Sequence, residues 1–481
     1  MHSGVWIESG GIWRLNNFGM LSIYFQTLGC KLNQLESESI TGAFTNAGFE
    51  LFKPSPGNYP SIVVINTCTV TSKADQKTRR IIRKTLRDFP ISFVIVTGCY
   101  AQLNSEEICK LETGGSGRLF VLKGREKDSL AKLPVLLETS GGGFTGEIKG
   151  RLGAAIKTLC EAGEERSVFH FSPKHFSGSV SPQRTRAFLK IQDGCGKNCT
   201  YCAIRLARGP SISLPAQEAL KRLKVLEENH SEVVLTGINI CQYCDPPEID
   251  NLGKLLDYLL AGTEKIALRL SSISPDSINE DIVKVFANNR VRPSFHLSIQ
   301  SGCDKTLERM GRDYKAASIE RAVDLLRSVK NDPFLACDIM AGFPGESEAD
   351  YLETFELCQK IGFAWIHVFP YSKRRGTPAW SFTDTVQEKE VSRRVQLLTG
   401  LAWQGRAAYV RRWLGCEVDV LIEKSAAAKP CRGVSENYLK LLVRHDGTKN
   451  PKPGTVLRCL LPMEQEIIPG NDFDAVAVEI K

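Results

Sequence analysis

The stretch Lys190-Ile-Gln-Asp-Gly-Cys195-Gly-Lys-Asn-Cys199-Thr-Tyr-Cys202 carries three cysteines in the spacing Cys-x3-Cys-x2-Cys. Three thiolates at this spacing can bind three corners of a four-iron, four-sulfur cube and leave the fourth iron open, whereas clusters of electron carriers usually take four thiolates. An open iron indicates chemistry, as an open position does at catalytic zinc. The alternatives are a zinc loop or three unrelated thiols. A zinc site usually has a fourth close ligand, and no further cysteine follows before Cys241.

The loop follows an apolar run, and from there six candidate strands alternate with helices. This alternation predicts an open (βα)6 partial barrel, because a closed barrel of this kind needs eight units. Sites in such folds lie at the carboxyl ends of the strands, and the cysteine loop follows the first strand as that rule requires. We expect strands at 187–191, 232–236, 266–271, 295–299, 335–340 and 365–369, and helices at 215–229, 252–261, 276–287, 315–329 and 347–361.

The N-terminal region repeats one arrangement three times, in which an apolar run ends in a turn that holds a cysteine. Helical stretches at 34–47 and 73–88 separate the runs, so the alternation predicts a parallel α/β sheet. All three cysteines then follow carboxyl ends of strands, where open α/β sheets place ligands. We therefore expect three thiols to converge at a second open-iron cluster, with three buried cysteines as the alternative. The runs 22–26, 61–65 and 92–96 precede Cys30, Cys68 and Cys99.

The loop, with Tyr201 before its last cysteine, resembles that of the radical S-adenosylmethionine enzymes. From about Ser22 to its end, the chain is similar to the methylthiotransferases of that superfamily. The resemblance is carried by Thr27-Leu-Gly-Cys30-Lys-Leu-Asn33-Gln34, Asn66-Thr-Cys68 and Thr97-Gly-Cys99. The Gly-Cys-Lys-x-Asn-Gln form most resembles the branch that acts on N6-threonylcarbamoyladenosine in tRNA.

The resemblance implies two [4Fe–4S] clusters and S-adenosylmethionine as cofactors. Cys195, Cys199 and Cys202 would hold the cluster that cleaves S-adenosylmethionine to a 5′-deoxyadenosyl radical. Cys30, Cys68 and Cys99 would hold a second cluster that binds or supplies the inserted sulfur. No side chain is expected to act as catalytic acid or base, since the clusters and S-adenosylmethionine carry the chemistry. Turns at strand ends are expected to bind the cofactor through Tyr201, Gly237, Asn239, Gln300, Ser301, Gly342 and Gly345.

The length of 481 residues exceeds one ordinary core, so several domains are expected. Apolar content of 42% and charged content of 24% are typical of soluble globular proteins, and no apolar run is long enough to span a bilayer. Sixteen cysteines without an export signal indicate metal ligation and reduced thiols in the cytoplasm. We interpret residues 1–20 as an extension, 21–135 as the methylthiotransferase N-terminal domain, 136–184 as a linker, 185–413 as the radical S-adenosylmethionine core and 414–481 as a third domain.

Two expected helices are rich in cations. A long helix at 387–413 carries Arg393, Arg394, Arg406, Arg411 and Arg412. The helix at 73–88 places Lys77, Arg80, Lys84 and Arg87 on one face, with Arg79 and Arg83 beside it. A surface that contacts RNA phosphates is one interpretation of this face, and an ordinary solvated helix face is the other.

The chain after Gly415 alternates apolar and polar residues in several short runs, which predicts a small antiparallel β-barrel. This part resembles the TRAM domain, an OB-like RNA-binding barrel. Candidate contacts to phosphates or bases are Arg432, Tyr438, Lys440 and Arg444, and a solvated barrel surface is the alternative.

The predicted function is methylthiolation of C2 of N6-threonylcarbamoyladenosine at position 37 of tRNA. The C2–H bond is not acidic enough for a side-chain base, whereas a cofactor radical can abstract its hydrogen. The expected partners are the tRNA anticodon loop and an electron donor such as flavodoxin or ferredoxin, with no membrane, and the protein is expected to be monomeric. The alternatives are a ribosomal-protein aspartate or an isopentenyladenosine in tRNA as substrate, or a binding protein with structural cysteines.

Overall fold

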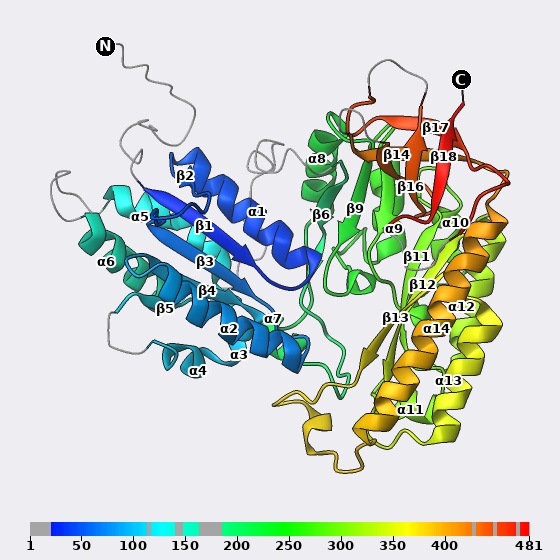
Figure 1. Ribbon diagram of the computed structural model, residues 1–481, viewed down its shortest axis with the longest axis horizontal. Coiled ribbons are helices and arrows are strands. Elements are labelled where there is room, and N and C mark those ends of the chain that lie inside the picture. The colour runs from blue at the N-terminus through cyan, green and yellow to red at the C-terminus, as the bar shows by residue number, and fades with distance from the viewer. Residues whose placement is uncertain are drawn as a thin grey trace. The chain divides into compact units, whose positions relative to one another are not determined.

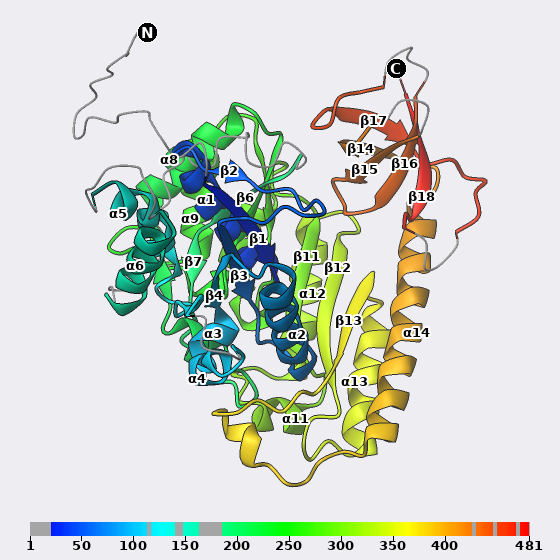
Figure 2. The same ribbon diagram turned by 60° about the vertical axis from the view of Figure 1, so that its left-hand side comes forward.

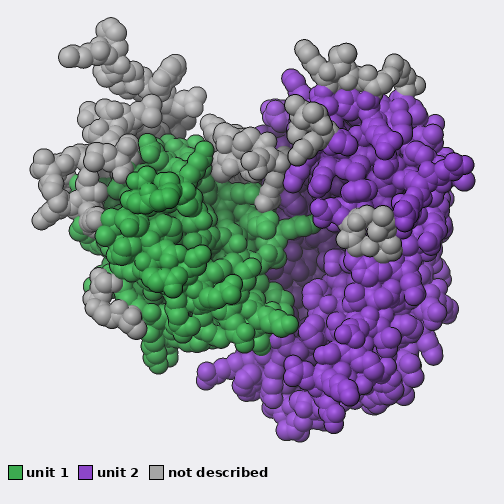
Figure 3. All heavy atoms as spheres, in the orientation of Figure 1, with its two compact units in different colours: residues 1–182, 206–208 green, residues 183–205, 209–481 purple. Residues whose placement is uncertain are grey.

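The computed structural model describes residues 21–112, 117–139, 148–162, 185–425, 430–445, 450–467 and 472–480. The chain forms two compact units, residues 1–182 with 206–208 and residues 183–205 with 209–481 (Figure 3). The expected extension, residues 1–20, lies outside the described residues.

The first unit is built on a parallel sheet with the strand order β2-β1-β3-β4-β5 (Figure 1), as the alternation of strands and helices predicted. Its strands are β1 (Ser22–Thr27), β2 (Glu50–Leu51), β3 (Ile62–Thr67), β4 (Phe93–Gly98) and β5 (Leu119–Val121). Its helices are α1 (Lys31–Asn46), α2 (Ser72–Asp88), α3 (Cys99–Leu103), α4 (Ser105–Cys109), η1 (Lys127–Lys132), α5 (Leu133–Thr139) and α6 (Ile148–Glu161).

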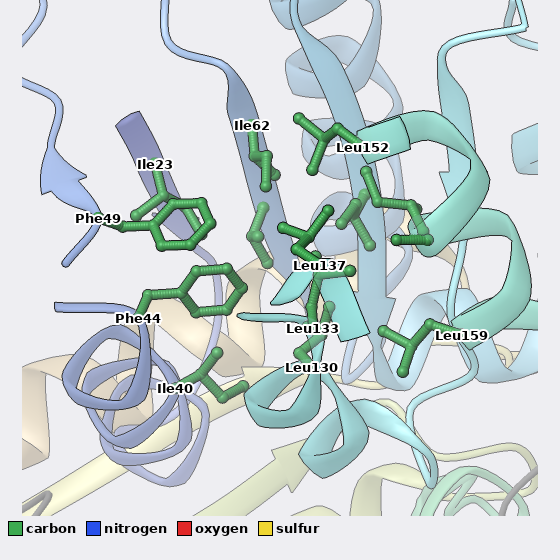
Figure 4. Close-up of a cluster of buried hydrophobic side chains, with 14 of the residues drawn as sticks. Ile23, Ile40, Phe44, Phe49, Ile62, Leu130, Leu133, Leu137, Leu152 and Leu159 are labelled. Atoms are coloured by element: carbon green, nitrogen blue, oxygen red, sulfur yellow. The ribbon is translucent and has the colours of Figure 1, made fainter. Parts of the chain in front are cut away.

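Helices cover both faces of this sheet, which explains why β3 is a continuous apolar run. Ile62 and Val64 pack into one cluster with side chains of α1, η1, α5 and α6 (Figure 4). Val63 and Ile65 point to the other face and pack against α2, α3 and α4. Because both faces are buried, the carboxyl edge of the sheet is the part left to form a site.

The described part of residues 136–184 is not a linker. Leu152, Ile156 and Leu159 of α6 are buried in the same cluster as Ile62, together with Leu137 of α5. The spacing of the three α6 residues is that of one helix face, but the glycines at 141–143 interrupt the pattern and suggested a connection instead. Residues 136–139 and 148–161 therefore pack within the first unit, while 140–147 and 163–184 lie outside the described residues.

The second unit begins with the six predicted parallel strands. They form two three-stranded sheets, β10-β9-β6 and β11-β12-β13, which single bridges join between Leu268 and Val291 and between Ile273 and Leu297. No pairing joins β6 to β13 in the part of the chain that the structure describes, so the barrel is open there. The strands are β6 (Ala187–Lys190), β9 (Glu232–Thr236), β10 (Ala267–Leu270), β11 (Ser294–Gln300), β12 (Phe334–Ala341) and β13 (Trp365–Pro370).

Helices and short segments connect these strands. They include a small antiparallel pair, β7 (Gln192–Asp193) with β8 (Ile212–Ser213), and three 3-10 turns, η3 (Ile240–Gln242), η4 (Pro275–Ser277) and η5 (Pro378–Ser381). The α-helices are α7 (Ile204–Arg208), α8 (Ala216–Glu227), α9 (Leu252–Ala261), α10 (Glu280–Phe286), α11 (Asp304–Arg309), α12 (Ala316–Val329) and α13 (Glu348–Ile361). The long helix α14 (Glu388–Arg412) packs against α13 and β13 and leads into the C-terminal strands (Figures 1 and 2).

The C-terminal strands close into a five-stranded barrel in the order β14-β15-β16-β18-β17. Val418, Val420 and Ile422 line its interior, as the alternation predicted. Four of its five strand pairs are antiparallel as expected, and the pair of β16 with β18 is parallel. The strands are β14 (Glu417–Lys424), β15 (Cys431–Ser435), β16 (Lys440–Arg444), β17 (Val456–Leu460) and β18 (Ala475–Glu479).

The barrel shares its core with the end of the partial barrel. Phe334 of β12 and Tyr409 and Val410 of α14 pack into the same hydrophobic cluster as the barrel interior. Buried cations also cross this junction, since Arg269 binds Glu232 at 2.8 Å and donates to the carbonyl of Glu436 at 3.2 Å. Similar ion pairs join Arg186 to Glu423 and Arg406 to Asp474. The two domains that we expected to meet at residues 413 and 414 therefore share one hydrophobic core.

Candidate functional site

The loop with Cys195, Cys199 and Cys202 follows β6 and β7 and is held by backbone hydrogen bonds to distant segments. The N–H of Cys195 donates to Gly209 O at 3.0 Å, and the N–H of Thr200 donates to Met310 O at 2.9 Å. A local bond from Cys202 N–H to Cys199 O, 3.1 Å, closes the turn between the last two cysteines. The cysteine spacing is therefore set by contacts on both sides of the loop.

The three sulfurs of this loop lie close enough to influence one another. Burial raises the pKa of Cys202 to about 12, and the neighbouring thiols of Cys199 and Cys195 add to the shift. The loss of three thiol protons at such a site needs a cationic partner, which a cluster iron provides when it binds the sulfur.

Two side chains donate to the sulfurs of this loop. Arg312 Nη1 lies 3.4 Å from Cys199 Sγ, and Asn239 Nδ2 lies 3.7 Å from Cys195 Sγ. Burial opposes the charge of Arg312, but Tyr201, Tyr314 and Cys199 outweigh it and raise its pKa above the usual value. Asn239 was expected to bind the cofactor. Arg312 was not predicted as a site residue, because it belongs to no recognisable sequence motif.

The glycines expected at the cofactor are required by the protein's own packing. A Cβ on Gly237 would lie 2.8 Å from the carbonyl oxygen of Gln192, whose side chain accepts the N–H groups of Ile238 and Asn239. Gly345 approaches Asp384 closely and donates to its carbonyl at 2.8 Å. A Cβ on Gly342 would lie 2.4 Å from Val391. Their contact with a cofactor stays a prediction.

The remaining expected cofactor residues differ in exposure. Tyr201 is partly buried and packs with Phe343, ring centroids 6.3 Å apart, so it connects the loop to the segment after β12. Ser301 is buried, and its hydroxyl bonds to Thr354 Oγ1 at 3.0 Å. Gln300 ends β11 in a left-handed conformation with φ 66°, which costs a non-glycine residue free energy and marks strand ends that serve a site.

The second trio lies at the carboxyl ends of three neighbouring strands. Cys30 precedes α1 after β1, Cys68 follows β3 directly, and Cys99 follows β4 directly as the first residue of α3. The sheet order β1-β3-β4 makes these ends adjacent. Burial raises the pKa of Cys68 to about 11, and the thiols of Cys99 and Cys30 add to the shift. The three cysteines therefore lie at adjacent strand ends, as the strand pattern predicted, and their role as ligands stays a prediction.

Close backbone packing surrounds Cys68. A Cβ on Gly29 would lie 2.4 Å from Cys68 Cβ, and a Cβ on Gly98, which has φ 96°, would lie 2.4 Å from Thr67 O. The Asn33 side chain donates to Leu28 O and Thr67 O, each at 2.9 Å. Only glycine fits at both turns, so the position of Cys68 is determined by the backbone itself.

A buried ion cluster lies behind this trio in the first unit. Glu36 of α1 is 2% exposed and binds both Lys127 of η1 and Arg208, whose Nη1 lies 2.9 Å from Glu36 Oε1. Arg208 also donates to Asn33 Oδ1 at 2.8 Å. Removing one partner from such a buried group leaves an uncompensated charge. Sequence reasoning missed this cluster because its members are far apart in the chain.

Most cations of α2 are exposed and carry no ion-pair partner among the described residues, whereas Arg87 pairs with Asp88 at 3.2 Å. Arg79 differs, because it donates to Tyr100 Oη at 2.9 Å and pairs with Glu107 at 3.2 Å. Like charges three or four residues apart destabilise a helix, so this face favours an external anion. The unpaired side chains are Lys77, Arg80, Arg83 and Lys84.

Four of the five arginines noted on α14, namely Arg393, Arg394, Arg406 and Arg412, pair with carboxylates within the second unit, and Arg411 is exposed. Arg394 binds Glu390 at 3.0 Å and also contacts Glu346 and Glu348. Arg412 binds Asp332 at 2.8 Å. The two helices look alike in sequence, but most arginines of α14 are paired with carboxylates, whereas most exposed cations of α2 are not.

Comparison with known proteins follows the same division of the chain. Residues 22–115 match the uncharacterized protein family UPF0004, and residues 189–358 match the radical SAM superfamily. The threonylcarbamoyladenosine tRNA methylthiotransferase MtaB of Treponema pallidum is 36% identical over 491 residues, which cover 93% of this chain and 100% of the relative. The protein of the same name from Thermotoga maritima is 34% identical over 428 residues, 88% of this chain and 91% of the relative.

The chain belongs to the MtaB family of radical SAM tRNA methylthiotransferases. A solved structure, the radical S-adenosylmethionine methyltransferase TsrM from Kitasatospora setae with cobalamin and a [4Fe-4S] cluster bound, matches at 15% identity with a TM-score of 0.50. The match covers 75% of this chain and 77% of that chain and shows a common fold. None of the helices in the described part of this MtaB-family chain is long and apolar enough to cross a membrane.

As a member of the MtaB family, the enzyme uses S-adenosylmethionine and two [4Fe–4S] clusters. The donor sets fit, since three thiols share one loop of eight residues at Cys195–Cys202 and three others lie at neighbouring strand ends. No group of three His, Cys, Asp or Glu side chains is arranged around a single metal ion within the described ranges. A four-iron cube does not need that arrangement, because its thiolates bind separate irons.

Proposed function

We propose that this enzyme inserts a methylthio group at C2 of N6-threonylcarbamoyladenosine at position 37 of tRNA. The observation that carries the proposal is the 36% identity to a relative named for threonylcarbamoyladenosine over 93% of this chain and the whole relative. Both cysteine trios lie within the matched families, and each provides the donors for one cluster. Cys195, Cys199 and Cys202 hold the cluster that binds S-adenosylmethionine. Cys30, Cys68 and Cys99 hold the cluster at which sulfur is delivered.

When bound, the clusters and S-adenosylmethionine supply a carbon-centred radical, a sulfur atom and a methyl group, which an unreactive C2–H bond requires. The chain's own residues hold and tune these groups. Arg312 and Asn239 donate to two cysteine sulfurs and stabilise their negative charge. Tyr201 and its aromatic neighbours exclude water from one side of the loop.

The tRNA is held by two surfaces in this proposal. The unpaired cations of α2 bind phosphates, which positions the RNA without reading its sequence. On the barrel, Arg432, Lys440 and Arg444 are exposed and suited to the same task. Tyr438 is not suited to base stacking, because Arg269 and Arg186 lie over its ring, 5.1 and 5.7 Å from the centroid.

We propose that the enzyme acts in the cytoplasm as a monomer, with a flavodoxin or a ferredoxin as electron donor. Sedimentation of the holoenzyme tests the monomer. Turnover with each reduced donor protein in place of a chemical reductant tests the electron source.

Nucleoside analysis tests the reaction. Mass spectrometry of tRNA from a strain lacking its own methylthiotransferase of this branch, complemented with this chain, is expected to show conversion of threonylcarbamoyladenosine to its 2-methylthio derivative. Unchanged threonylcarbamoyladenosine with a new methylthio group on isopentenyladenosine or on a ribosomal-protein aspartate would contradict the proposed substrate. Anaerobic reconstitution with fewer than about eight irons per chain and no 5′-deoxyadenosine would instead favour a binding protein with structural cysteines.

A further inference from the structure

The segment between β13 and α14, gold in Figures 1 and 2, exposes a large aromatic side chain beside unpaired cations. Trp380 in η5 is 47% exposed, and Phe369 near the end of β13 is 44% exposed. Tryptophan gains several kcal/mol from burial. A half-exposed indole with a cation over its ring is therefore a candidate binding surface.

Contacts to the cysteine loop hold this segment in place. Ala379 N–H donates to Thr200 O at 2.8 Å, and Tyr371 Oη donates to Ala379 O at 3.1 Å. Thr200 lies between Cys199 and Cys202, so the residue before Trp380 is bonded directly to the loop. Phe382 continues the attachment, because it packs on Phe343, which also contacts Tyr201. Trp380 is thus presented on a fixed turn beside the expected radical cluster.

One cation lies over the indole, and a second exposed cation lies two residues after the first in the same segment. Lys373 Nζ lies 5.4 Å from the centroid of the Trp380 ring, and Lys373 and Arg375 are both exposed. Neither has a carboxylate partner in the described ranges of the chain. Aromatic faces with adjacent cations are the means by which proteins bind single-stranded nucleic acid, because bases stack on the ring while phosphates pair with the cations. The exposed ring and the neighbouring positive charge both favour this use.

We propose that Trp380 stacks on a base of the anticodon loop that neighbours the target adenosine, while Lys373 and Arg375 bind the flanking phosphates. The proposal rests on tRNA as the substrate and assigns a contact in the radical SAM part of the chain, apart from the barrel. The contact is made by an unpaired loop base, since bases stacked in a duplex do not offer a free face.

Binding of an anticodon stem-loop RNA to the reconstituted holoenzyme tests the proposal. Trp380→Ala is expected to weaken binding about 5- to 140-fold, the equivalent of one stacked base. Trp380→Phe is expected to keep most of the affinity because it keeps an aromatic face. Lys373→Gln combined with Arg375→Gln is expected to reduce the slope of log K against log salt by about 1.4, or 0.7 for each phosphate contact on a single strand.

Matched controls separate this site from general effects. Leu352→Ala on α13 removes another exposed apolar side chain, and Lys221→Gln with Lys224→Gln on α8 removes two other exposed charges. Both controls are expected to bind the stem-loop as the wild type does. Iron content and unfolding midpoint verify that each variant is folded.

The result that overturns the proposal is a folded Trp380→Ala variant that binds the stem-loop within about twofold of wild type. Equal losses for Trp380→Phe and Trp380→Ala would also overturn it, because stacking would not distinguish them. If Trp380→Ala binds normally while the wild type methylthiolates threonylcarbamoyladenosine, only this inference fails. If the wild type binds the stem-loop through Trp380 but leaves that nucleoside unmodified, the proposed reaction fails and the contact stands.

Discussion

The two cysteine trios reach similar arrangements by different routes. Cys195, Cys199 and Cys202 share one loop, and side chains from other segments donate to two of their sulfurs. Cys30, Cys68 and Cys99 come from three strand ends, and the donors that lower the pKa of Cys68 against its burial are the backbone N–H groups of Thr69 and Val70. The loop therefore has side-chain donors in addition to the backbone N–H of Ile204 at Cys202, whereas the donors at Cys68 are backbone N–H groups.

The largest expected effect comes from removing one ligand of each trio. Cys195→Ala should abolish both 5′-deoxyadenosine formation and methylthiolation, because the loop then lacks the ligands for its cluster. Cys30→Ala should abolish methylthiolation while 5′-deoxyadenosine still forms. Each variant should lose about half of the roughly eight irons. Chromatography of 5′-deoxyadenosine and of the methylthiolated nucleoside measures both effects. Equal loss of 5′-deoxyadenosine in the two variants would contradict the assignment of radical formation to the Cys195 cluster and sulfur delivery to the Cys30 cluster.

Backbone changes should affect the strand-end site more than the loop. Gly98→Ala places a Cβ 2.4 Å from Thr67 O at φ 96°, so we expect a loss of about 1–3 kcal/mol from the backbone conformation alone and loss of the strand-end cluster. Gly311→Ala, at φ 69° with its nearest contact 3.2 Å away at Asn198 O, should cost about 1 kcal/mol and leave both clusters bound. Unfolding midpoints and iron content measure the two changes. A greater loss of stability or of iron in Gly311→Ala than in Gly98→Ala would contradict the expectation that the strand-end site is more sensitive to backbone changes.

Side-chain changes should affect the loop without touching the strand-end site. Arg312→Gln removes a cation beside Cys199, which should lower the reduction potential of that cluster and slow 5′-deoxyadenosine formation about 10- to 100-fold. Arg312→Lys keeps the charge and should recover part of the potential. Redox titration followed by electron paramagnetic resonance measures both. Equal potentials for the two variants would show that geometry, rather than charge, is the contribution of Arg312.

The smallest effect is expected for Asn239→Ala. Its amide donates to Cys195 Sγ over 3.7 Å, a long hydrogen bond from a neutral group. Its loss should slow 5′-deoxyadenosine formation about 2- to 10-fold. The same redox titration and rate assay measure this variant. A larger drop in the rate of 5′-deoxyadenosine formation than in Arg312→Gln would show that Asn239 contributes more to the cluster than Arg312 does.

Local pattern was sufficient to predict the strands and the strand-end cysteines. β9 and α9 have the predicted bounds, and β3 and β4 end directly before Cys68 and Cys99. These features depend on residues that are close in sequence, namely the spacing of the apolar residues in each strand and the polar turn that follows it. The family resemblance rests on the same short motifs.

Contacts between distant residues were not predictable. Arg312 reaches Cys199 across more than a hundred positions, and Glu36 meets Lys127 and Arg208 from three separate segments. In β15, Gly433 interrupts the apolar–polar alternation. That glycine allows close approach to β14, since a Cβ there would lie 2.5 Å from Val420 Cγ1. The pairing of the α14 arginines, which distinguishes that helix from α2, is equally non-local.

The shared core of barrel and partial barrel has a practical consequence. A chain truncated at 413 would uncover Phe334 and Tyr409 and leave Arg406 without the carboxylate of Asp474. Exposed apolar surface of this kind leads to association between chains. Such a truncation would report on aggregation rather than on RNA affinity, so the contribution of the barrel is better measured with point variants at its exposed cations.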